Sequence, residues 1–141
     1  MDIKGKNIII TGGSLGIGKE TAFELLNKGA NVLVTGRSID RLQQAFINSN
    51  AKLMSFDISD IDNLNLNAQR CLDIFNGNID VLINNAGVGV RKSIDKLSYN
   101  DFINVYNVNV FGLALFTKEI VKVMKIQKKG TIINIGSTAS L

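Results

Sequence analysis

The feature of this sequence that most constrains its fold is a glycine-rich turn between an apolar run and a helical pattern. Residues 8–10 are three consecutive isoleucines, as expected of a parallel strand that is buried on both faces. Gly12, Gly16 and Gly18 follow at once, and the pattern from Gly16 to Lys28 is typical of a helix. A strand, a glycine turn and a helix form the phosphate-binding start of a dinucleotide-binding fold, because the free N–H groups at the helix start favour an anion.

Each glycine of this turn has an expected task. Gly12 lets the chain turn sharply, Gly16 lets the backbone approach a pyrophosphate, and Gly18 lets the helix lie close to the strand. The spacing is Gly-x-x-x-Gly-x-Gly, which differs from the Gly-x-Gly-x-x-Gly of the general dinucleotide fingerprint. A tight strand-to-helix turn that binds no ligand remains the alternative for this turn considered alone.

Strand and helix patterns alternate along the whole chain. Apolar runs predict strands at residues 7–10, 31–35, 52–56, 79–83 and 131–135. Helical patterns cover residues 16–28, 39–47, a stretch that starts at Ser59 and Asp60, and residues 101–125. Ser38 and the Ser98–Asp101 stretch are expected to cap two of these helices. This alternation predicts an α/β fold, a doubly wound parallel sheet with strand order 3-2-1-4-5, in which residues 1–141 form one Rossmann domain with a ligand crevice between strands one and four.

Composition excludes several classes of site. Cys71 is the single cysteine of the 141 residues, so an internal disulfide is excluded, and the helical pattern around it indicates a buried apolar residue rather than a reactive thiol. There is no histidine, which excludes a Ser-His-Asp arrangement, and we expect no metal site. The net charge of +4 comes partly from lysines between residues 118 and 129, and without aromatic platforms this favours a solvated basic face over a nucleic-acid surface.

The chain carries no apolar run that approaches the length of a membrane span. Its first residues lead directly into the first predicted strand. We therefore expect no membrane segment, no leader peptide and a cytoplasmic location.

Four motifs in order resemble the short-chain dehydrogenase/reductase family, in its compact single-domain branch. They are the Thr-Gly-x-x-x-Gly-x-Gly turn from Thr11, Asn84-Asn85-Ala86-Gly87, the stretch Asn107–Gly112, and the stretch Gly130–Ser137. The resemblance implies an oxidoreductase that transfers a hydride between a nicotinamide and a small carbonyl or alcohol substrate, and that forms homo-oligomers. The substrate itself is not predicted, because the loops that select it lie outside these motifs.

Arg37 and Ser38 leave the second strand where a dinucleotide-binding fold meets the adenosine ribose. An acid at this point would bind the ribose 2′-hydroxyl and favour NAD, but here Gly36 leaves room and the Arg37 guanidinium suits a 2′-phosphate, to which Ser38 can also donate. These residues predict NADP(H) in preference to NAD(H). The alternative is a solvated arginine near a helix start, and Leu15 occupies the place at which NADP-preferring members of the resembled family often carry a second basic residue.

The resemblance also implies the remaining cofactor contacts. Asp57 would bind the adenine amino group and Ile58 would cover the ring, although a turn or helix-cap aspartate is an equal alternative. Asn85 would tie neighbouring loops together, while Ala86 and Gly87 leave room for the cofactor. The full set of implied cofactor-binding residues is Gly12, Ser14, Leu15, Gly16, Ile17, Gly18, Arg37, Ser38, Asp57, Ile58, Asn85, Ala86 and Gly87.

Two residues are the candidates for the catalytic site. Asn109 is a polar amide among apolar helix positions, so it must find partners or cost about 1–3 kcal/mol. The resemblance implies that it holds a proton-relay water, and the alternative is a satisfied core asparagine. Ser137 would orient the substrate oxygen. For the neighbouring Thr138 and Ser140 only a turn role is expected.

The proton donor of the resembled family, a tyrosine in the pattern Tyr-x-x-x-Lys, is not found in these 141 residues. Tyr99 is followed four places later by Ile103, and Tyr106 by Val110. We therefore expect a domain truncated after strand five, inactive by itself, and the alternative function is a non-catalytic dinucleotide-binding module. Strand five would then be an apolar edge, which predicts self-association or marginal stability.

Overall fold

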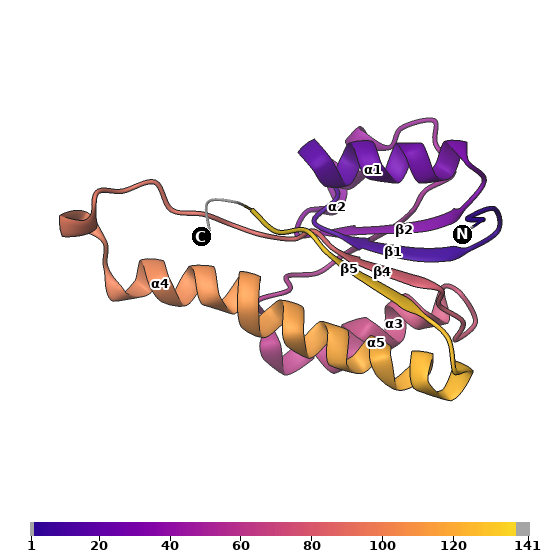
Figure 1. Cartoon of the computed structure of the whole chain (residues 1–141). Coiled ribbons are helices and arrows are strands. Elements are labelled where there is room, and N and C mark those ends of the chain that lie inside the picture. The colour runs from indigo at the N-terminus through magenta and orange to yellow at the C-terminus, as the bar shows by residue number, and fades with distance from the viewer. Residues whose placement is uncertain (1, 138–141) are drawn as a thin grey trace.

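The three isoleucines at residues 8–10 lie in the central strand of a parallel sheet (Figure 1). The computed structural model describes residues 2–137. Its strands are β1 (Asn7–Thr11), β2 (Asn31–Gly36), β3 (Lys52–Ser55), β4 (Val81–Asn84) and β5 (Thr131–Asn134). Its α-helices are α1 (Gly16–Asn27), α2 (Ile39–Ala45), α3 (Leu64–Asp73), α4 (Tyr99–Tyr106) and α5 (Leu113–Gln127). Two 3₁₀ turns, η1 (Ile61–Asn63) and η2 (Ile94–Lys96), and one π-helical segment, η3 (Asn107–Gly112), complete the described elements.

All neighbouring strands run parallel, in the order β3-β2-β1-β4-β5. Ile9 pairs with Leu33 of β2 on one side and with Leu82 of β4 on the other. The predicted fold class and strand order are therefore confirmed. The order reverses between β1 and β4, so the loops that follow these two strands meet at the carboxyl edge of the sheet.

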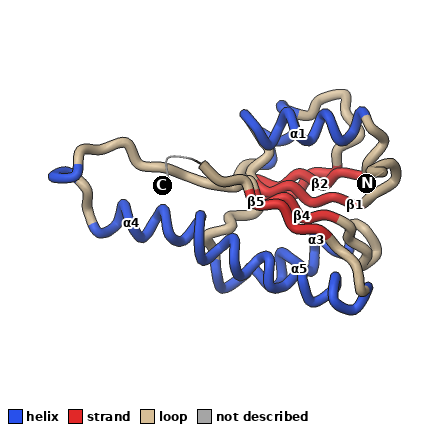
Figure 2. The backbone as a smooth tube through the Cα atoms, viewed as in Figure 1, coloured by secondary structure: helices blue, strands red, loops and turns tan. Residues whose placement is uncertain are grey.

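Helices cover both faces of the sheet, with α1 on one face and α3 and α5 on the other (Figure 2). Ile8 and Ile10 pack in a core cluster with Ala22 of α1 and Leu42 of α2. Ile9 packs in the opposite cluster with residues of α3 and α5. All three isoleucines are no more than 1% exposed, which explains why the run is unbroken rather than alternating.

The start of the third helix differs from the prediction. Ser59 and Asp60 do not begin an α-helix, because Asp57 fixes Ser59 in a turn. Asp57 Oδ1 accepts hydrogen bonds from the Ser59 N–H at 2.9 Å and from the Ser59 hydroxyl at 2.7 Å. The chain then passes through η1, and α3 begins only at Leu64.

The helix predicted over residues 101–125 is also different, because it is not one α-helix. It begins earlier, with the capping box between Ser98 and Asp101, which confirms the predicted cap. The helical path then changes from α4 to the π-helical segment η3 and returns to α-helix in α5. The predicted cap at Ser38 is confirmed as well, since its Oγ accepts the N–H of Arg41 at 3.3 Å.

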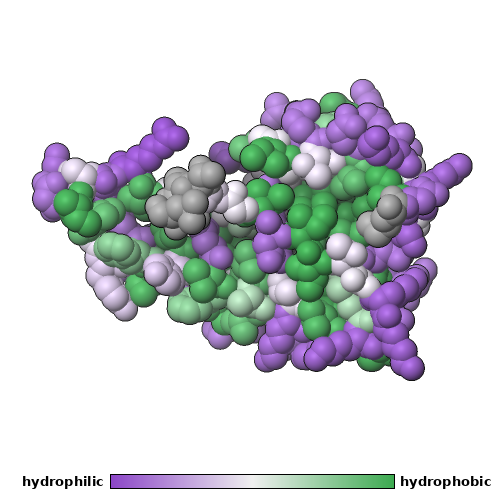
Figure 3. Space-filling view, viewed as in Figure 1, coloured by the Kyte–Doolittle hydropathy of each residue, from purple (hydrophilic) through white to green (hydrophobic). Residues whose placement is uncertain are grey.

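Part of the apolar surface lies outside the two core clusters. Helix α4 has no buried residue and extends beyond the sheet (Figure 1). Ile132, Ile133 and Ile135, in β5 and just after it, are 37–41% exposed. Figure 3 shows apolar side chains gathered over β5 on this face.

Cys71 is buried on α3, as predicted, with its Sγ 3.9 Å from the sulfur of Met54. Burial raises the pKa of its thiol to about 12, although the nearby Arg70 charge acts in the opposite direction. A thiol with this pKa is protonated at neutral pH and is therefore a poor nucleophile. Within residues 2–137, no helix combines the length and the apolar character that crossing a membrane would require.

Candidate dinucleotide-binding pocket

A pocket of about 390 Å³ opens at the carboxyl edge of the sheet. The loops that follow β1, β2, β3 and β4 form its walls, and Val108 of η3 reaches it from the long helix. All residues implied as cofactor contacts line it except Gly18, which packs behind it. Seven further residues line it: Thr11, Thr35, Gly36, Arg41, Phe56, Val88 and Val108.

The glycine turn is held by close backbone contacts. Gly12 has a φ of +68°, and a Cβ added there would lie 2.6 Å from Ala86 Cα. A Cβ on Gly18 would lie 2.3 Å from Asn85 Nδ2. The positive φ of Gly12 fits the sharp turn predicted there, and both glycines permit a close approach that a side chain would block.

Gly16 is different, because a Cβ there would meet open space. Its φ is +58°, which disfavours side chains for backbone reasons alone. Gly13 was not singled out from the sequence, yet a Cβ on it would lie 2.3 Å from Val34 Cγ1. The sequence around Gly13 does not indicate this contact, because Val34 lies on β2, 21 residues later in the chain.

Asn85 and Thr11 join the loops that follow β4 and β1. Asn85 Nδ2 donates to the carbonyl oxygens of Thr11 at 3.1 Å and Gly12 at 2.9 Å. The Thr11 hydroxyl in turn accepts the N–H groups of Asn85 and Ala86, each at 3.1 Å. Thr11 was part of the family motif, but its role in fixing the second loop became visible only from these contacts.

Asn84, the last residue of β4, is buried and binds groups of α5 and β5. Its Nδ2 donates to Thr117 Oγ1 of α5 at 2.8 Å and to Asn134 Oδ1 of β5 at 2.9 Å. Asn84 is 1% exposed. Asn84 therefore connects β4 with β5 and α5, whereas Asn85 makes the connection between neighbouring loops that the sequence predicts.

Two arginines line the pocket beyond the end of β2. Arg37 directly follows Gly36, whose added Cβ would be in ordinary contact with Leu42 at 3.5 Å. Arg41 comes from the first turn of α2 and lines the same pocket. Sequence reasoning missed Arg41. The helix spacing rule does not connect it to Arg37, because Arg37 lies before the Ser38 N-cap of α2.

The β3 end contributes Phe56, Asp57 and Ile58. The Phe56 ring lies 5.5 Å from that of Phe116, which is fully buried on α5. Asp57 takes the turn role described above through Oδ1, and it also lines the pocket. Ile58 is 7% exposed and packs in the core, so its backbone is firmly held at the pocket wall.

Asn109 of η3 binds the backbone of the loop after β4. Its Oδ1 accepts the Val88 N–H at 2.9 Å, and its Nδ2 donates to the Val88 carbonyl oxygen at 2.9 Å. The amide is thus satisfied by main-chain groups, which agrees with the satisfied asparagine that was the alternative reading. Asn109 itself does not line the pocket.

Ser137 follows β5, is exposed, and does not line the pocket. Thr138 and Ser140 lie outside the described residues. Leu15 and Ile17, each 66% exposed, place apolar side chains at the rim of the pocket. Among residues 2–137, no cluster of three or more His, Cys, Asp or Glu side chains is arranged to hold a metal ion.

Residues 6–141 match the model of the family described as short chain dehydrogenase. An uncharacterised oxidoreductase of Staphylococcus saprophyticus is 33% identical over 98% of this chain and 57% of its own length. An NADP-dependent 3-hydroxy acid dehydrogenase of Schizosaccharomyces pombe is 32% identical over 97% of this chain and 56% of its own. Among solved structures, ElxO with NADP bound is 32% identical with a TM-score of 0.85, over 94% of this chain and 56% of its own. The chain thus spans little more than half of the length of each of these proteins.

Proposed function

The chain belongs to the short-chain dehydrogenase family, and from this premise we propose that it is the cofactor-binding part of an NADP(H)-dependent oxidoreductase. The reaction is the transfer of a hydride between nicotinamide and a small carbonyl or alcohol substrate. The observation that carries the proposal is one pocket in which a glycine turn and two arginines meet at the same edge of the sheet.

The glycine turn suits a pyrophosphate. Open space lies beside Gly16 on the pocket side, so a phosphate can approach the backbone closely. Leu15 occupies the N-cap of α1 and makes no side-chain cap hydrogen bond. The first N–H groups of this 12-residue helix therefore remain for an anion, which the helix dipole also favours.

The end of β2 suits a ribose 2′-phosphate. Arg37 and Arg41 bring two guanidinium groups to this part of the pocket, and the Gly36-Arg37-Ser38 sequence carries no acid that would repel a phosphate. Arg41 takes the part of the second basic residue that Leu15 does not supply in the glycine turn. The S. pombe relative is named as NADP-dependent and ElxO was solved with NADP, which supports NADP(H) in preference to NAD(H).

The other walls suit the two rings of the cofactor. Ile58 is placed to cover the adenine, and Asp57, whose Oδ1 holds Ser59, has Oδ2 to accept the adenine amino group. Ala86 and Gly87 leave a flat wall for the nicotinamide, which supplies the hydride when bound. Asn109 holds Val88 and so fixes this wall, and Ser137 is proposed to orient the substrate oxygen as charge develops on it.

A second candidate function is dinucleotide binding without turnover. The observation that favours it is the lack of a Tyr-x-x-x-Lys pattern in these 141 residues. We propose that residues 1–141 alone bind NADPH and do not oxidise it. NADPH oxidation with a panel of carbonyl substrates separates the two functions: turnover by this chain would refute the module, and binding without turnover would support it.

The cofactor preference is tested by titrating NADPH and NADH against the wild type and the variants Arg37→Ala and Arg41→Ala. Each variant is expected to weaken NADPH binding about tenfold, because a charge-assisted hydrogen bond to the 2′-phosphate is lost, and to leave NADH nearly unchanged. Arg70→Ala, on α3 and outside the pocket, controls for the loss of one positive charge. Equal losses for the two cofactors would contradict the proposed 2′-phosphate site.

We further propose that the protein forms homo-oligomers through its exposed apolar surface. Phe102, Val110 and Phe111 of the α4–η3 stretch are 44–49% exposed, and the isoleucines of β5 are similarly exposed. Exposed apolar side chains that gather on a surface are typical of an interaction site. Sedimentation is expected to show self-association that increases with concentration, and a monomer at all concentrations would refute it.

A further inference from the structure

Gly112 stands at a position where the helix backbone itself does not require glycine. It ends the π-helical segment η3 and has ordinary right-handed angles, φ −60° and ψ −49°. Glycine inside a helix is less favourable than alanine because it loses more backbone entropy on folding. The reason for a glycine here must therefore come from its surroundings.

The surroundings leave no space for a side chain. A Cβ added to Gly112 would lie 2.2 Å from the carbonyl oxygen of Ile58 and 3.0 Å from its carbonyl carbon. These are backbone atoms, which cannot rotate away as the end of a flexible side chain does. Gly112 is buried, and Ile58 is a buried residue of the pocket wall.

The same segment also holds the opposite wall of the pocket. Val108 lines the pocket directly, and the Asn109 amide makes two hydrogen bonds of 2.9 Å to the backbone of Val88. Six consecutive residues thus contact the loop after β3 at one end and the loop after β4 in the middle. Single-turn π-helical segments inside α-helices are frequently found at functional sites.

We propose that Gly112 is a positioning residue for the dinucleotide: it lets η3 pack directly against the Ile58 carbonyl and so sets the position of the wall that covers the adenine. This rests on the proposed function, since it assumes that a dinucleotide binds in the pocket. A side chain at residue 112 moves Ile58 away from the helix and opens the adenine side. Gly112 acts only through Ile58 and touches no ligand.

The test is a double-mutant cycle with adenosine 2′,5′-bisphosphate as the probe. Gly112→Ala is expected to raise its Kd about tenfold. In the Ile58→Ala background, where the covering side chain is already lost, Gly112→Ala is expected to add less than about twofold, because residues that act together are not additive. Ile120→Val, a core variant of α5 away from the pocket, is expected to lower Tm and leave the Kd unchanged.

The outcomes separate this inference from the proposed function. If the wild type does not bind the adenosine bisphosphate, the proposed function fails. If the wild type binds it, but Gly112→Ala leaves the Kd unchanged or adds its full effect to that of Ile58→Ala, only the positioning role is overturned.

Hydrogen exchange on the wild type gives a second measurement that does not depend on the variant folding. Binding of the adenosine bisphosphate is expected to slow amide exchange in residues 107–112, because η3 and the Ile58 wall are in direct contact. Amides of α3, which do not line the pocket, serve as the control. Unchanged exchange across residues 107–112 on binding would overturn the proposal.

Discussion

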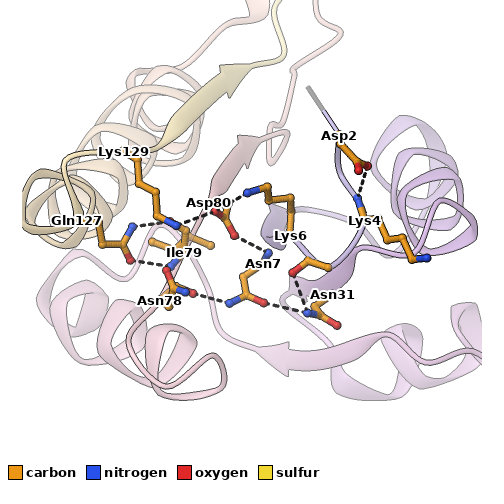
Figure 4. Close-up of polar contacts among 11 residues, drawn as sticks. Asp2, Lys4, Lys6, Asn7, Asn31, Asn78, Ile79, Asp80, Gln127 and Lys129 are labelled. Atoms are coloured by element: carbon orange, nitrogen blue, oxygen red, sulfur yellow. Dashed lines mark hydrogen bonds and ion pairs between the residues drawn. The ribbon is translucent and has the colours of Figure 1, made fainter.

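At the amino end of the sheet the charged side chains form ion pairs with one another, whereas at the carboxyl end two arginines that form no ion pair within residues 2–137 line an open pocket. Figure 4 shows the first region. Asp80 accepts the N–H of Asn7 at 3.0 Å and forms ion pairs with Lys6 at 3.4 Å and Lys129 at 3.5 Å. One carboxylate thus joins the start of β1, the start of β4 and the approach to β5.

Amide side chains complete the network at the amino end. Gln127 pairs with both backbone groups of Ile79, accepting its N–H at 3.0 Å and donating to its carbonyl oxygen at 2.8 Å. Asn7 donates to the carbonyl oxygen of Asn78 at 2.9 Å and accepts from Asn31 at 3.1 Å. The amide groups of Gln127, Asn7 and Asn31 therefore hydrogen-bond within the protein and hold strand ends and the end of α5 together.

The carboxyl end shares only part of this arrangement, because Thr11, Asn84 and Asn85 bind neighbouring groups while two arginines line the open pocket. In the part of the chain that the structure describes, neither Arg37 nor Arg41 forms an ion pair, and no side chain caps the start of α1. Arg37 and Arg41 are both exposed, so water solvates their guanidinium groups, which remain accessible to a ligand. The comparison teaches that the amino end of the sheet contributes stability, and that the carboxyl end holds the open pocket to which we assign the dinucleotide.

The largest expected effect comes from placing an alanine at the carboxyl end. Gly12→Ala combines a positive φ of +68° with a contact of 2.6 Å to Ala86 Cα. It should lower the free energy of unfolding by about 3 kcal/mol and abolish NADPH binding. Chemical unfolding and NADPH titration measure the two effects.

Gly5→Ala is the matched control at the amino end. Gly5 has a φ of +72°, with no atom near an added Cβ. It should cost only the backbone strain, about 1 kcal/mol, and leave NADPH binding intact. Equal effects of the two substitutions would remove the proposed difference between the two ends.

Asp80→Ala tests the amino end directly. It removes the partner of the Asn7 N–H and of two lysines, and should lower the free energy of unfolding by about 2 kcal/mol. The Kd for NADPH should stay within about twofold, because distant sites act independently. A Kd that rises in step with the loss of stability would show that the two ends are coupled.

Gln127→Met is expected to have a smaller effect. Methionine keeps the length of the side chain but loses both hydrogen bonds to Ile79, which should cost about 1 kcal/mol. The exposed Gln43→Met serves as the matched control and should be neutral. Thermal unfolding compares the two, and an unchanged Tm for Gln127→Met would argue against a structural role for the pair.

The smallest expected effect is a decrease in Tm at acidic pH that comes from Asp80. Burial raises the pKa of Asp80, but the N–H of Asn7 and the charges of Lys6 and Lys129 outweigh it and hold the pKa below its ordinary value of 3.8. Because the folded-state pKa is the lower one, the stabilisation is fully present above the ordinary value and is lost as the pH falls through the folded-state value. Between pH 5 and the acid range, about pH 2, Tm should fall less in Asp80→Asn than in the wild type; parallel curves would exclude this contribution.

The sequence predicted the parts of the fold that depend on local patterns. The unbroken isoleucines at residues 8–10 and the regular alternation of strands and helices were enough for the strand order. The capping residues Ser38 and Ser98 also act locally, within their own helix turn. Several pocket-lining residues were identified because the glycine turn and the Asn84–Gly87 motif each lie next to a strand end.

Other features could not be predicted, because their causes lie far away in the sequence. Thr11 fixes the loop after β4, whose amide partners are 74 and 75 residues away. Gly112 of the π-helical segment lies against the Ile58 carbonyl, 54 residues earlier in the chain, and one extra residue hardly changes a helical apolar pattern. Arg41 required knowing which side of α2 faces the pocket.

The continuous path from α4 through η3 to α5 has a consequence for how helical order is maintained. Helix α5 is 15 residues long and buries Phe116, Ile120 and Met124, whereas α4 has eight residues and buries none. A helix as short as α4 does not form stably on its own, because the free energy gained from its few helical turns is smaller than the free-energy cost of nucleating the helix. Its first turn is fixed by the capping box between Ser98 and Asp101. Hydrogen bonds from Lys92 and Ser98 to the Asp101 carboxylate lower its pKa to about 2. We expect the rest of α4 to be helical by propagation from α5, so α4 should lose its helical structure from the exposed end inward while α5 remains folded.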